Sequence, residues 1–290
     1  MASLLSNPKS NNNNDSKFND LTTFMTNTLS PEDDVRKHAT LSIQELSKQI
    51  GFSVALIQII ENNNTTTTNN GTRLASATYL KNFIKKNWNK TLTNEEEQEQ
   101  IKTAVLNALL RVQLSDRAIR SLFAECFRLI SIQEFPEKWK NLEITLSETL
   151  KQALLSTDNN GNNNLSTLSN VVLATYQVCK RYEFFQKVSH GPKDVPSELD
   201  SISNLILPSL INNVFVVKCT TRNEKDNDLL RMIAKLFFRI TRSYMPTICE
   251  NLAPIVLSNS MNVLNEINLG MYLSIYKIAS PIHHMTSTNI

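Results

Sequence analysis

The sequence predicts an all-α fold, a HEAT-repeat (armadillo-like) α-solenoid with about five to six helix pairs. The 290 residues include only 5 Gly and 9 Pro, and long stretches consist of Leu, Ile, Ala, Lys, Glu and Gln, which favour helices. Between its polar tracts, apolar residues recur at steps of three and four, which is the period of an amphipathic helix. No pattern alternates strands with helices, so a parallel α/β sheet is excluded.

The first predicted helix follows Ser30-Pro31-Glu32, where an N-cap serine, a proline and an acid mark a helix start. It ends near Gly51, and its apolar face carries Val35, Ala39, Ile43 and Leu46. Residues 52–60 form an apolar run that fits a buried strand or a buried helix, and we expect a short helix because its neighbours are helical. Residues 73–88 give the clearest amphipathic helix, with a stripe of Leu74, Ala77, Leu80, Ile84 and Trp88.

Further helices follow in close succession. Residues 93–96 (TNEE) start one with acids in its first turn, and its stripe is Ile101, Ala104, Val105, Ala108, Leu109 and Val112. The next, over residues 115–132, carries Ala118, Leu122, Cys126 and Leu129. Pro136 is expected to begin a helix that runs to Leu155. The last helices are expected at 165–188, 198–217, 226–243 and 247–267.

The helices come in consecutive pairs, separated in two places by Asn-rich tracts at 62–71 and 158–164 that are expected to be solvated loops. Without these tracts, each pair approaches the roughly 40–47 residues of a HEAT or armadillo repeat. One pair is too thin to bury its own face, so the pairs must stack. The predicted organisation is a disordered Asn-rich tail at 1–14, N-terminal repeats at 15–142, further repeats at 143–270 and an irregular or truncated end at 271–290.

Composition excludes several classes of function. The formal net charge of +3 is too small to favour direct nucleic-acid binding. The cysteines lack metal-binding or CxxC spacing and are expected to be buried free thiols: Cys126, Cys179, Cys219 and Cys249. The histidines have no further ligands beside them, and no phosphate-loop, nucleophile-elbow or zinc-protease motif occurs. We therefore expect no enzyme activity, metal or cofactor. No signal peptide and no apolar run of roughly 18 residues is found, so a soluble setting is expected.

Three blocks in order resemble the N-terminal region of the importin-β (karyopherin-β) family. They are VRKHATLSIQELSKQIGFSVALIQII (35–60), RLASATYLKNFIKKNW (73–88) and EFPEKWKNL (134–142). A fourth block, VVLATYQVCKRYEFF (171–185), is similar to the importin-seven and importin-eight subgroup. Members of this family contain many more repeats, so the chain is expected to be a fragment of a longer array.

The resemblance implies a monomeric nuclear transport receptor of nucleus, cytoplasm and nuclear pore that binds GTP-loaded Ran and protein cargo in nuclear import, with nucleoporins as further candidate partners. The alternatives are an exportin of the same family, a HEAT scaffold without a GTPase partner, and an enzyme accessory subunit. The candidate contacts with Ran are Arg36, Arg73, Lys81 and Asn82. Arg73 is also placed to bond within the repeats, and Lys81 and Asn82 also fit a solvated helix face. The structural anchors are Trp88, Pro136 and Trp139. The basic cluster Lys81, Lys85, Lys86 and Lys90 is expected to be a solvated face rather than a nucleic-acid patch.

Overall fold

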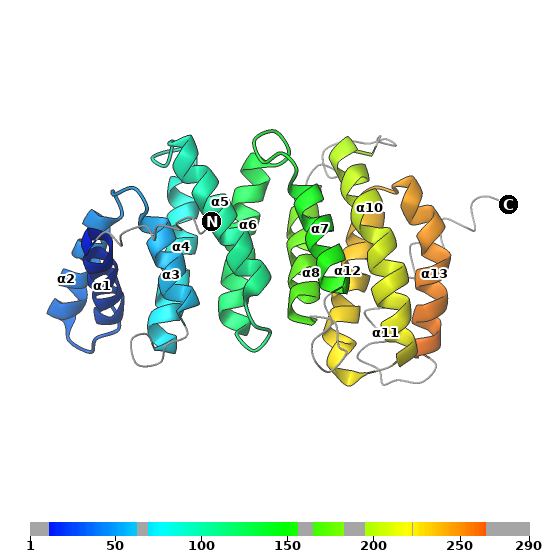
Figure 1. Cartoon of the computed structure of the whole chain (residues 1–290), viewed down its shortest axis with the longest axis horizontal. Coiled ribbons are helices and arrows are strands. Elements are labelled where there is room, and N and C mark those ends of the chain that lie inside the picture. Colours follow the sequence, from blue (N-terminus) through cyan, green and yellow to red (C-terminus); the bar gives the residue numbers. More distant parts are fainter. Residues whose placement is uncertain (1–11, 63–68, 156–164, 183–194, 222, 265–290) are drawn as a thin grey trace, which may run out of the picture. The chain divides into compact units, whose positions relative to one another are not determined.

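The computed structural model describes residues 12–62, 69–155, 165–182, 195–221 and 223–264. Within these ranges the secondary structure is helical, and the only β feature is an isolated bridge between Trp88 and Leu92. The α-helices (Figure 1) are α1 (Asn12–Asn27), α2 (Asp33–Leu46), α3 (Phe52–Glu61), α4 (Asn70–Asn87), α5 (Glu95–Arg111), α6 (Arg117–Glu134), α7 (Leu142–Leu155), α8 (Leu165–Cys179), α10 (Ser197–Leu210), α11 (Val216–Thr221), α12 (Asn227–Ser243) and α13 (Thr247–Leu264). The all-α prediction is therefore confirmed.

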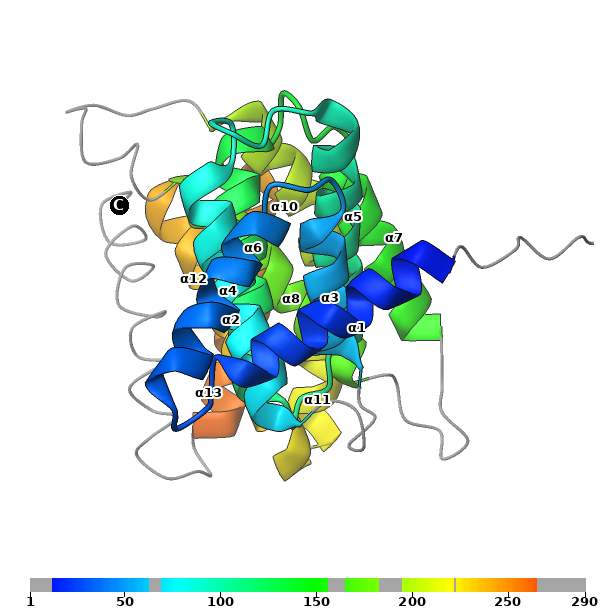
Figure 2. The ribbon, with the colours of Figure 1, turned by 90° about the vertical axis from the view of Figure 1, so that its left-hand side faces the viewer.

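The chain divides into two compact units. One comprises Met1–Ala108 with Asp116–Cys126, and the other comprises Leu109–Ser115 with Phe127–Ile290. In the first unit, α1 packs against α2 and α3 packs against α4. Helix α1 also contacts α3 and α4, and Figure 2 shows it crossing in front of α3. The predicted pairing of α3 with α4 is thus confirmed, and the domain boundary at residue 142 stays a prediction.

Helix α1 occupies a segment for which the sequence predicts no helix. Asn and Thr have low helix propensity, and they fill much of this segment. Two apolar side chains one turn apart, Leu21 and Met25, are buried at 3% and 1% exposure. The Oγ1 atoms of Thr26 and of Thr72 on α4 lie 3.0 Å apart. Packing against neighbouring helices therefore stabilises α1, rather than its own propensity. The helix begins at Asn12, inside the predicted tail, and residues 1–11 lie outside the described ranges.

Helix α2 begins at Asp33, two residues after Pro31, the first helical residue that the sequence predicts. Glu32 is the N-cap, and the hydroxyl of Ser30 accepts a hydrogen bond of 3.2 Å from the Glu32 N–H. The Arg36 guanidinium donates to the carbonyls of Ser30 and Pro31 at 2.8 and 2.7 Å. Ser30 and Pro31 therefore lie in the turn between α1 and α2, where the Arg36 side chain takes the place of helical N–H groups as the donor to their carbonyls.

The apolar run after Gly51 is helix α3, which resolves the ambiguity between a strand and a helix. Gly51 caps it with a left-handed φ of 85°, a conformation that favours glycine. The side chains of Leu56, Ile59 and Ile60 are completely buried. The Gly51 turn brings the end of α2 against α4, and this corner shapes the candidate site described below.

Asparagines start two of the helices in the first unit. The Asn69 side chain accepts from the Thr72 N–H at 2.7 Å, which places the start of α4 inside the segment predicted as a loop. Asn94 Oδ1 accepts from the Glu97 N–H at 3.0 Å and starts α5 as predicted. The stripe on α4 is buried at Ala77, Leu80, Ile84 and Trp88, whereas Leu74 is 42% exposed and does not belong to it.

Two predictions around α6 are wrong. Its buried side is made by Ile119, Phe123, Cys126, Phe127 and Ile130, whereas Ala118 is exposed and Leu122 and Leu129 are only half-buried. Pro136 does not begin the next helix, which starts at Leu142. The N–H groups of Lys138 and Trp139 both donate to the Glu134 carbonyl, at 2.7 and 2.8 Å. Pro136 therefore lies, after a cis peptide bond with Phe135, in the turn that closes α6.

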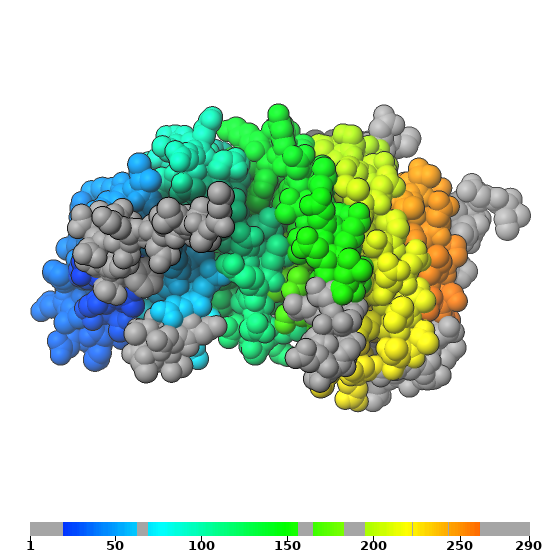
Figure 3. Space-filling model, in the orientation of Figure 1, coloured from blue at the N-terminus to red at the C-terminus, as the bar shows by residue number. Residues whose placement is uncertain are grey.

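The second unit stacks helix on helix. Helix α7 packs on α8, α10 packs on α7, and α12 packs on α8. Helix α13 contacts α10 and α11. Figure 3 shows α7, α10 and α13 as successive layers of one surface, in green, yellow and orange. The buried side chain of Asn170 on α8 donates to the carbonyls of Leu110 and Val112 at 3.3 and 2.8 Å, and so fixes the segment that ends α5. Stacked helix pairs of this kind define a solenoid repeat.

The predicted helix 198–217 is longer than expected and is not uniform. It continues from α10 through a π-helical segment, Ile211–Phe215, into α11. The π segment begins shortly after Pro208, which lacks an N–H for the helix ladder. By length and composition Ser197–Thr221 is apolar enough to cross a membrane, but half of it is buried inside the molecule. Core helices of soluble proteins meet the same criterion, so this is weak support for a membrane span. The predicted segments 183–188, 265–267 and 271–290 lie outside the described residues.

Candidate partner-binding site

The four predicted contact residues do not form one cluster. Arg36 closes the turn between α1 and α2 through its bonds to the carbonyls of Ser30 and Pro31, and its Nη2 pairs with Asp33 at 2.9 Å. It is half-buried. A side chain that already makes these local bonds holds the corner of the first repeat, and this is the role that its geometry supports.

Arg73 is an internal connector. Its side chain is 8% exposed, its Nε donates to the Ile60 carbonyl at 2.8 Å, and its Nη2 pairs with Asp116 at 2.9 Å. A third bond of 3.3 Å reaches Asn70. The guanidinium thus ties the end of α3 and the start of α4 to the residue that precedes α6. The sequence leaves two roles open for Arg73, a contact with Ran or bonding within the repeats. The structure shows the bonding within the repeats.

Lys81 and Asn82 are neighbours in sequence but face different surroundings. Adjacent helical residues point about 100° apart. Burial raises the pKa of the Cys126 thiol in α6, and the charge of Lys81 offsets only a part of this rise. Asn82 is exposed and lines a pocket on the side of α2. The pair therefore does not act as a single contact, and Asn82 alone belongs to the pocket.

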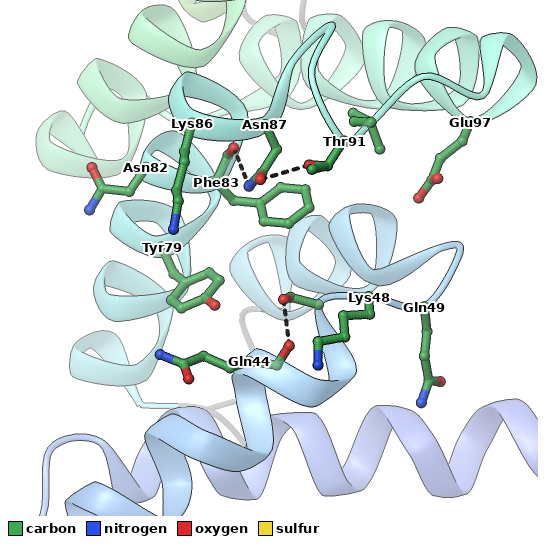
Figure 4. Close-up of a pocket in the computed structure, with 12 residues that line it drawn as sticks. Gln44, Lys48, Gln49, Tyr79, Asn82, Phe83, Lys86, Asn87, Thr91 and Glu97 are labelled. Atoms are coloured by element: carbon green, nitrogen blue, oxygen red, sulfur yellow. Dashed lines mark hydrogen bonds between the residues drawn. The ribbon is translucent and has the colours of Figure 1, made fainter.

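The pocket has a volume of about 630 Å³ and lies between the end of α2, the second half of α4 and the start of α5. This volume is within the range of small-ligand and peptide sites. Figure 4 shows its walls, with Lys86 and Tyr79 projecting from α4 and Lys48 from the opposite side, after α2. Its lining residues are Gln44, Ser47, Lys48, Gln49, Tyr79, Asn82, Phe83, Lys86, Asn87, Thr91, Leu92 and Glu97.

Aromatic rings stiffen the base of this pocket. The ring of Phe52 lies 5.8 Å from that of Tyr79 and 5.4 Å from that of Phe83, both at tilted or edge angles that suit aromatic pairs. Burial raises the pKa of the Tyr79 hydroxyl, and a side-chain hydrogen bond with Ser47 partly offsets this rise. The hydroxyl therefore stays protonated at neutral pH and remains a hydrogen-bonding group.

Polar bonds fix the upper wall. Asn87 Nδ2 donates to the Phe83 carbonyl at 2.9 Å, and the Thr91 hydroxyl donates to Asn87 Oδ1 at 2.8 Å. Glu97 Oε1 accepts from the Gly51 N–H at 3.1 Å, so this nearly buried carboxylate is used inside the protein. The groups left for a partner are Lys86 and the amides of Gln44, Gln49 and Asn82, whereas Lys48 pairs with both carboxylate oxygens of Glu45 at 2.8 and 2.9 Å. Such a surface suits a polar peptide segment that carries acidic side chains.

Most of these lining residues are missed by sequence reasoning. The sequence predicts Lys86 on a solvated basic face, and it gives no signal for Gln44, Lys48 and Gln49. The sequence does contain the Gly51-Phe52 junction that folds α2 back toward α4, but the pocket depends on how far the two helices separate. That separation is a property of the packing and is not readable from helix periods.

The predicted anchors differ in burial. Trp88 is 2% exposed at the C-terminal end of α4, and its role as an anchor stays a prediction. Trp139 is half-buried and contacts the Phe127 ring edge-on at 5.4 Å. Pro136 is half-buried in the turn after α6. Trp139 and Pro136 therefore support one turn of the second unit, and Trp88 supports the core of the first.

The four cysteines are buried thiols that form no disulfide bond, as expected. Burial raises the pKa of Cys179 and of Cys249 to about 12, so both thiols stay protonated at neutral pH. Among the described residues no group of three or more His, Cys, Asp or Glu side chains is arranged to hold a metal ion.

The stacked helix pairs define the class of protein, a HEAT-repeat α-solenoid. The chain resembles the exportin Cse1 in its cargo-free, cytoplasmic state, with a TM-score of 0.69 and 19% identity over 88% of this chain and 26% of that one. More particularly, residues 39–111 match the importin-beta N-terminal domain family. These findings support the importin-β family, and the matched family is a class of transport receptors and not of enzymes.

Curated relatives point the same way. Exportin-2 of Dictyostelium discoideum is 25% identical over 76% of this chain and 23% of its own length. Exportin-2 of Xenopus laevis is 22% identical over 84% of this chain and 24% of its own length. The chain thus spans about a quarter of the length of these relatives. The importin-seven and importin-eight subgroup is not supported, and neither is import as the direction of transport, because the relatives are exportins.

Proposed function

We propose that this chain is the Ran-binding N-terminal part of an exportin-type nuclear transport receptor. The observation that carries the proposal is that every residue lining the pocket, from Gln44 to Glu97, falls within the segment 39–111 that matches the importin-beta N-terminal domain. The relatives named exportin-2 favour an exporter over an importer. The proposed setting is shuttling between nucleus and cytoplasm, with a monomeric chain and with nucleoporins as further partners.

Within this proposal the contact with GTP-loaded Ran is made by Asn82 and Lys86 on one wall of the pocket and by Lys48 on the other. Lys86 attracts acidic groups, Lys48 does so by exchanging its pair with Glu45, and the amides of Gln44 and Asn82 offer both donors and acceptors. Lys81 contributes from the adjacent face of α4. Arg36 and Arg73 contribute indirectly, because they hold the helices that carry the pocket.

The central test compares two neighbouring lysines. Lys85 and Lys86 are both exposed on α4 and carry the same charge, but only Lys86 lines the pocket. The chain is immobilised, and binding of Ran loaded with a non-hydrolysable GTP analogue or with GDP is measured by biolayer interferometry. We expect binding of the GTP form only, about tenfold weaker for Lys86→Ala and nearly unchanged for Lys85→Ala. Equal losses for both variants would place the contact outside the pocket.

A second measurement separates the transport classes. Nuclear extract is passed over the immobilised chain with and without GTP-loaded Ran. An exporter retains additional protein when Ran is present, whereas an importer releases it, because the two ligands are coupled with opposite sign. Absence of Ran binding in both nucleotide states would favour the remaining alternative, a HEAT scaffold without a GTPase partner.

A further inference from the structure

The second unit carries a basic face made by two helices that pack side by side, α8 and α12. Four cationic residues of α12 recur at steps of three and four, which places them along one side of the helix. Lys180 follows α8 one turn after Tyr176. The α8–α12 basic face consists of Tyr176, Lys180, Arg231, Lys235, Arg239 and Arg242.

This face has an excess of positive charge. It holds five Lys and Arg residues, and the only acid on α8 or α12 is Asp228, which pairs with Arg231. Its net charge of +4 exceeds the +3 of the whole sequence, so the remainder of the chain has a net charge of about −1. Arg231, Lys235 and Arg242 are exposed, while Lys180 and Arg239 are half-buried. The opposite side of α12 is apolar and buried, so the charged side cannot turn inward.

Aromatic rings orient two of the guanidinium groups. Arg239 lies over the ring of Tyr176, 4.1 Å from its centroid, and its Nη2 donates to the Tyr176 hydroxyl at 2.6 Å. Arg242 lies 5.9 Å from the centroid of the Phe238 ring. A planar guanidinium stacked in this way loses less conformational entropy when it binds a carboxylate through its fork. The face is therefore pre-arranged as well as charged.

We propose that the α8–α12 basic face binds an acidic, Asp- and Glu-rich segment of a partner protein. Guanidinium forks match carboxylates, and the spacing along α12 offers one cation per turn to an extended acidic chain. Nucleic acid fits less well, because a single strand needs open aromatic faces for base stacking and Arg239 already covers Tyr176. This inference goes beyond the proposed function, since the face belongs to the second unit and lies outside residues 39–111.

The test measures binding of a fluorescein-labelled poly-Glu peptide to the full chain by anisotropy. The variant Arg231→Gln/Lys235→Gln/Arg242→Gln removes three exposed charges from the face. The control Lys138→Gln/Lys140→Gln/Lys151→Gln removes three exposed charges from the same unit but elsewhere. We expect the first variant to bind about tenfold more weakly or worse and the control to change less than about twofold. Binding should also weaken as salt rises from about 50 to about 300 mM.

Three outcomes would overturn the proposal. They are an equal loss in both triple variants, no binding of poly-Glu above that of a poly-Gln peptide, or tighter binding of a poly-dT strand of equal charge. Circular dichroism of both variants ensures that folded proteins are compared. Ran binding is measured in parallel and should be unchanged in the face variant. If the unmodified chain does not bind Ran, the proposed function is contradicted, but the conclusion from poly-Glu binding still holds.

Discussion

Replacing Arg73 by Met tests whether the most recognisable segment of the sequence serves the fold or a partner. The substitution keeps the apolar stem and removes the guanidinium that bonds Ile60, Asn70 and Asp116. The Ile60 carbonyl then loses a buried donor, which costs about 1–3 kcal/mol. Asp116 is 32% exposed, so water can replace its partner and the lost pair adds only about 0.5–1 kcal/mol. We therefore expect the free energy of unfolding of the first unit to fall by about 1.5–4 kcal/mol.

The assay needs a signal from the first unit alone, and the sequence provides one. The chain has two tryptophans, Trp88 in the first unit and Trp139 in the second. In a Trp139→Phe background, fluorescence during urea unfolding reports on the unit that contains Arg73. The control Lys85→Met removes an exposed charge from the same helix and should change stability by less than about 0.5 kcal/mol. A change that small for Arg73→Met, together with a large loss of Ran binding, would refute the internal role.

Three further predictions follow from burial and backbone geometry. Trp88→Ala should destabilise its unit by about 3–5 kcal/mol, whereas Trp139→Ala, which truncates a half-buried ring, should cost about half as much, as measured by urea unfolding. Gly51→Ala should cost about 1–2 kcal/mol in the same assay through its φ of 85° alone, because a Cβ there meets no atom within 4 Å. Burial raises the pKa values of Cys179 and Cys249 from 9.0 to about 12, so their contribution to stability is full below about pH 9 and is lost as the pH rises toward 12. Mass spectrometry should find both thiols unreactive toward iodoacetamide in the folded chain and reactive in urea; labelling of the folded chain at the unfolded rate would contradict this burial.

Much of the fold could be predicted because the strongest helices are encoded locally. The stripe from Ala77 to Trp88 and the Asn94 cap need no information from outside their own helices. The short helix after Gly51 also followed, because its neighbours were helical. In each case the local period, the caps and the packing agree, which is the condition under which sequence reasoning succeeds.

Where the local signal and the packing disagree, the sequence is misleading. Helix α1 has a polar, Asn-rich sequence and forms around two buried side chains, Leu21 and Met25. Pro136 carries a helix-start signal, yet the Glu134 carbonyl binds the following N–H groups and holds the residue in a turn. The buried side of α6 is displaced from the predicted one, since Phe123 and Phe127 are buried whereas Leu122 is only half-buried. The burial pattern is set by packing, and the Pro136 turn by hydrogen bonds, neither of which a helix period or a single start signal contains.

The candidate site illustrates the same limit. A family signature combines residues that maintain the fold with residues that meet a partner, and the sequence alone does not separate them. The structure distinguishes them by exposure and bonding, since Arg73 is nearly buried with three internal bonds while Asn82 is exposed at a pocket. A comparison of Lys85 with Lys86 separates general charge attraction from a specific contact in the same way. General electrostatic attraction would weaken equally on removal of Lys85 or Lys86, whereas a contact in the pocket requires Lys86 alone. The difference between those two single variants therefore measures the part of binding that depends on the shape of the site.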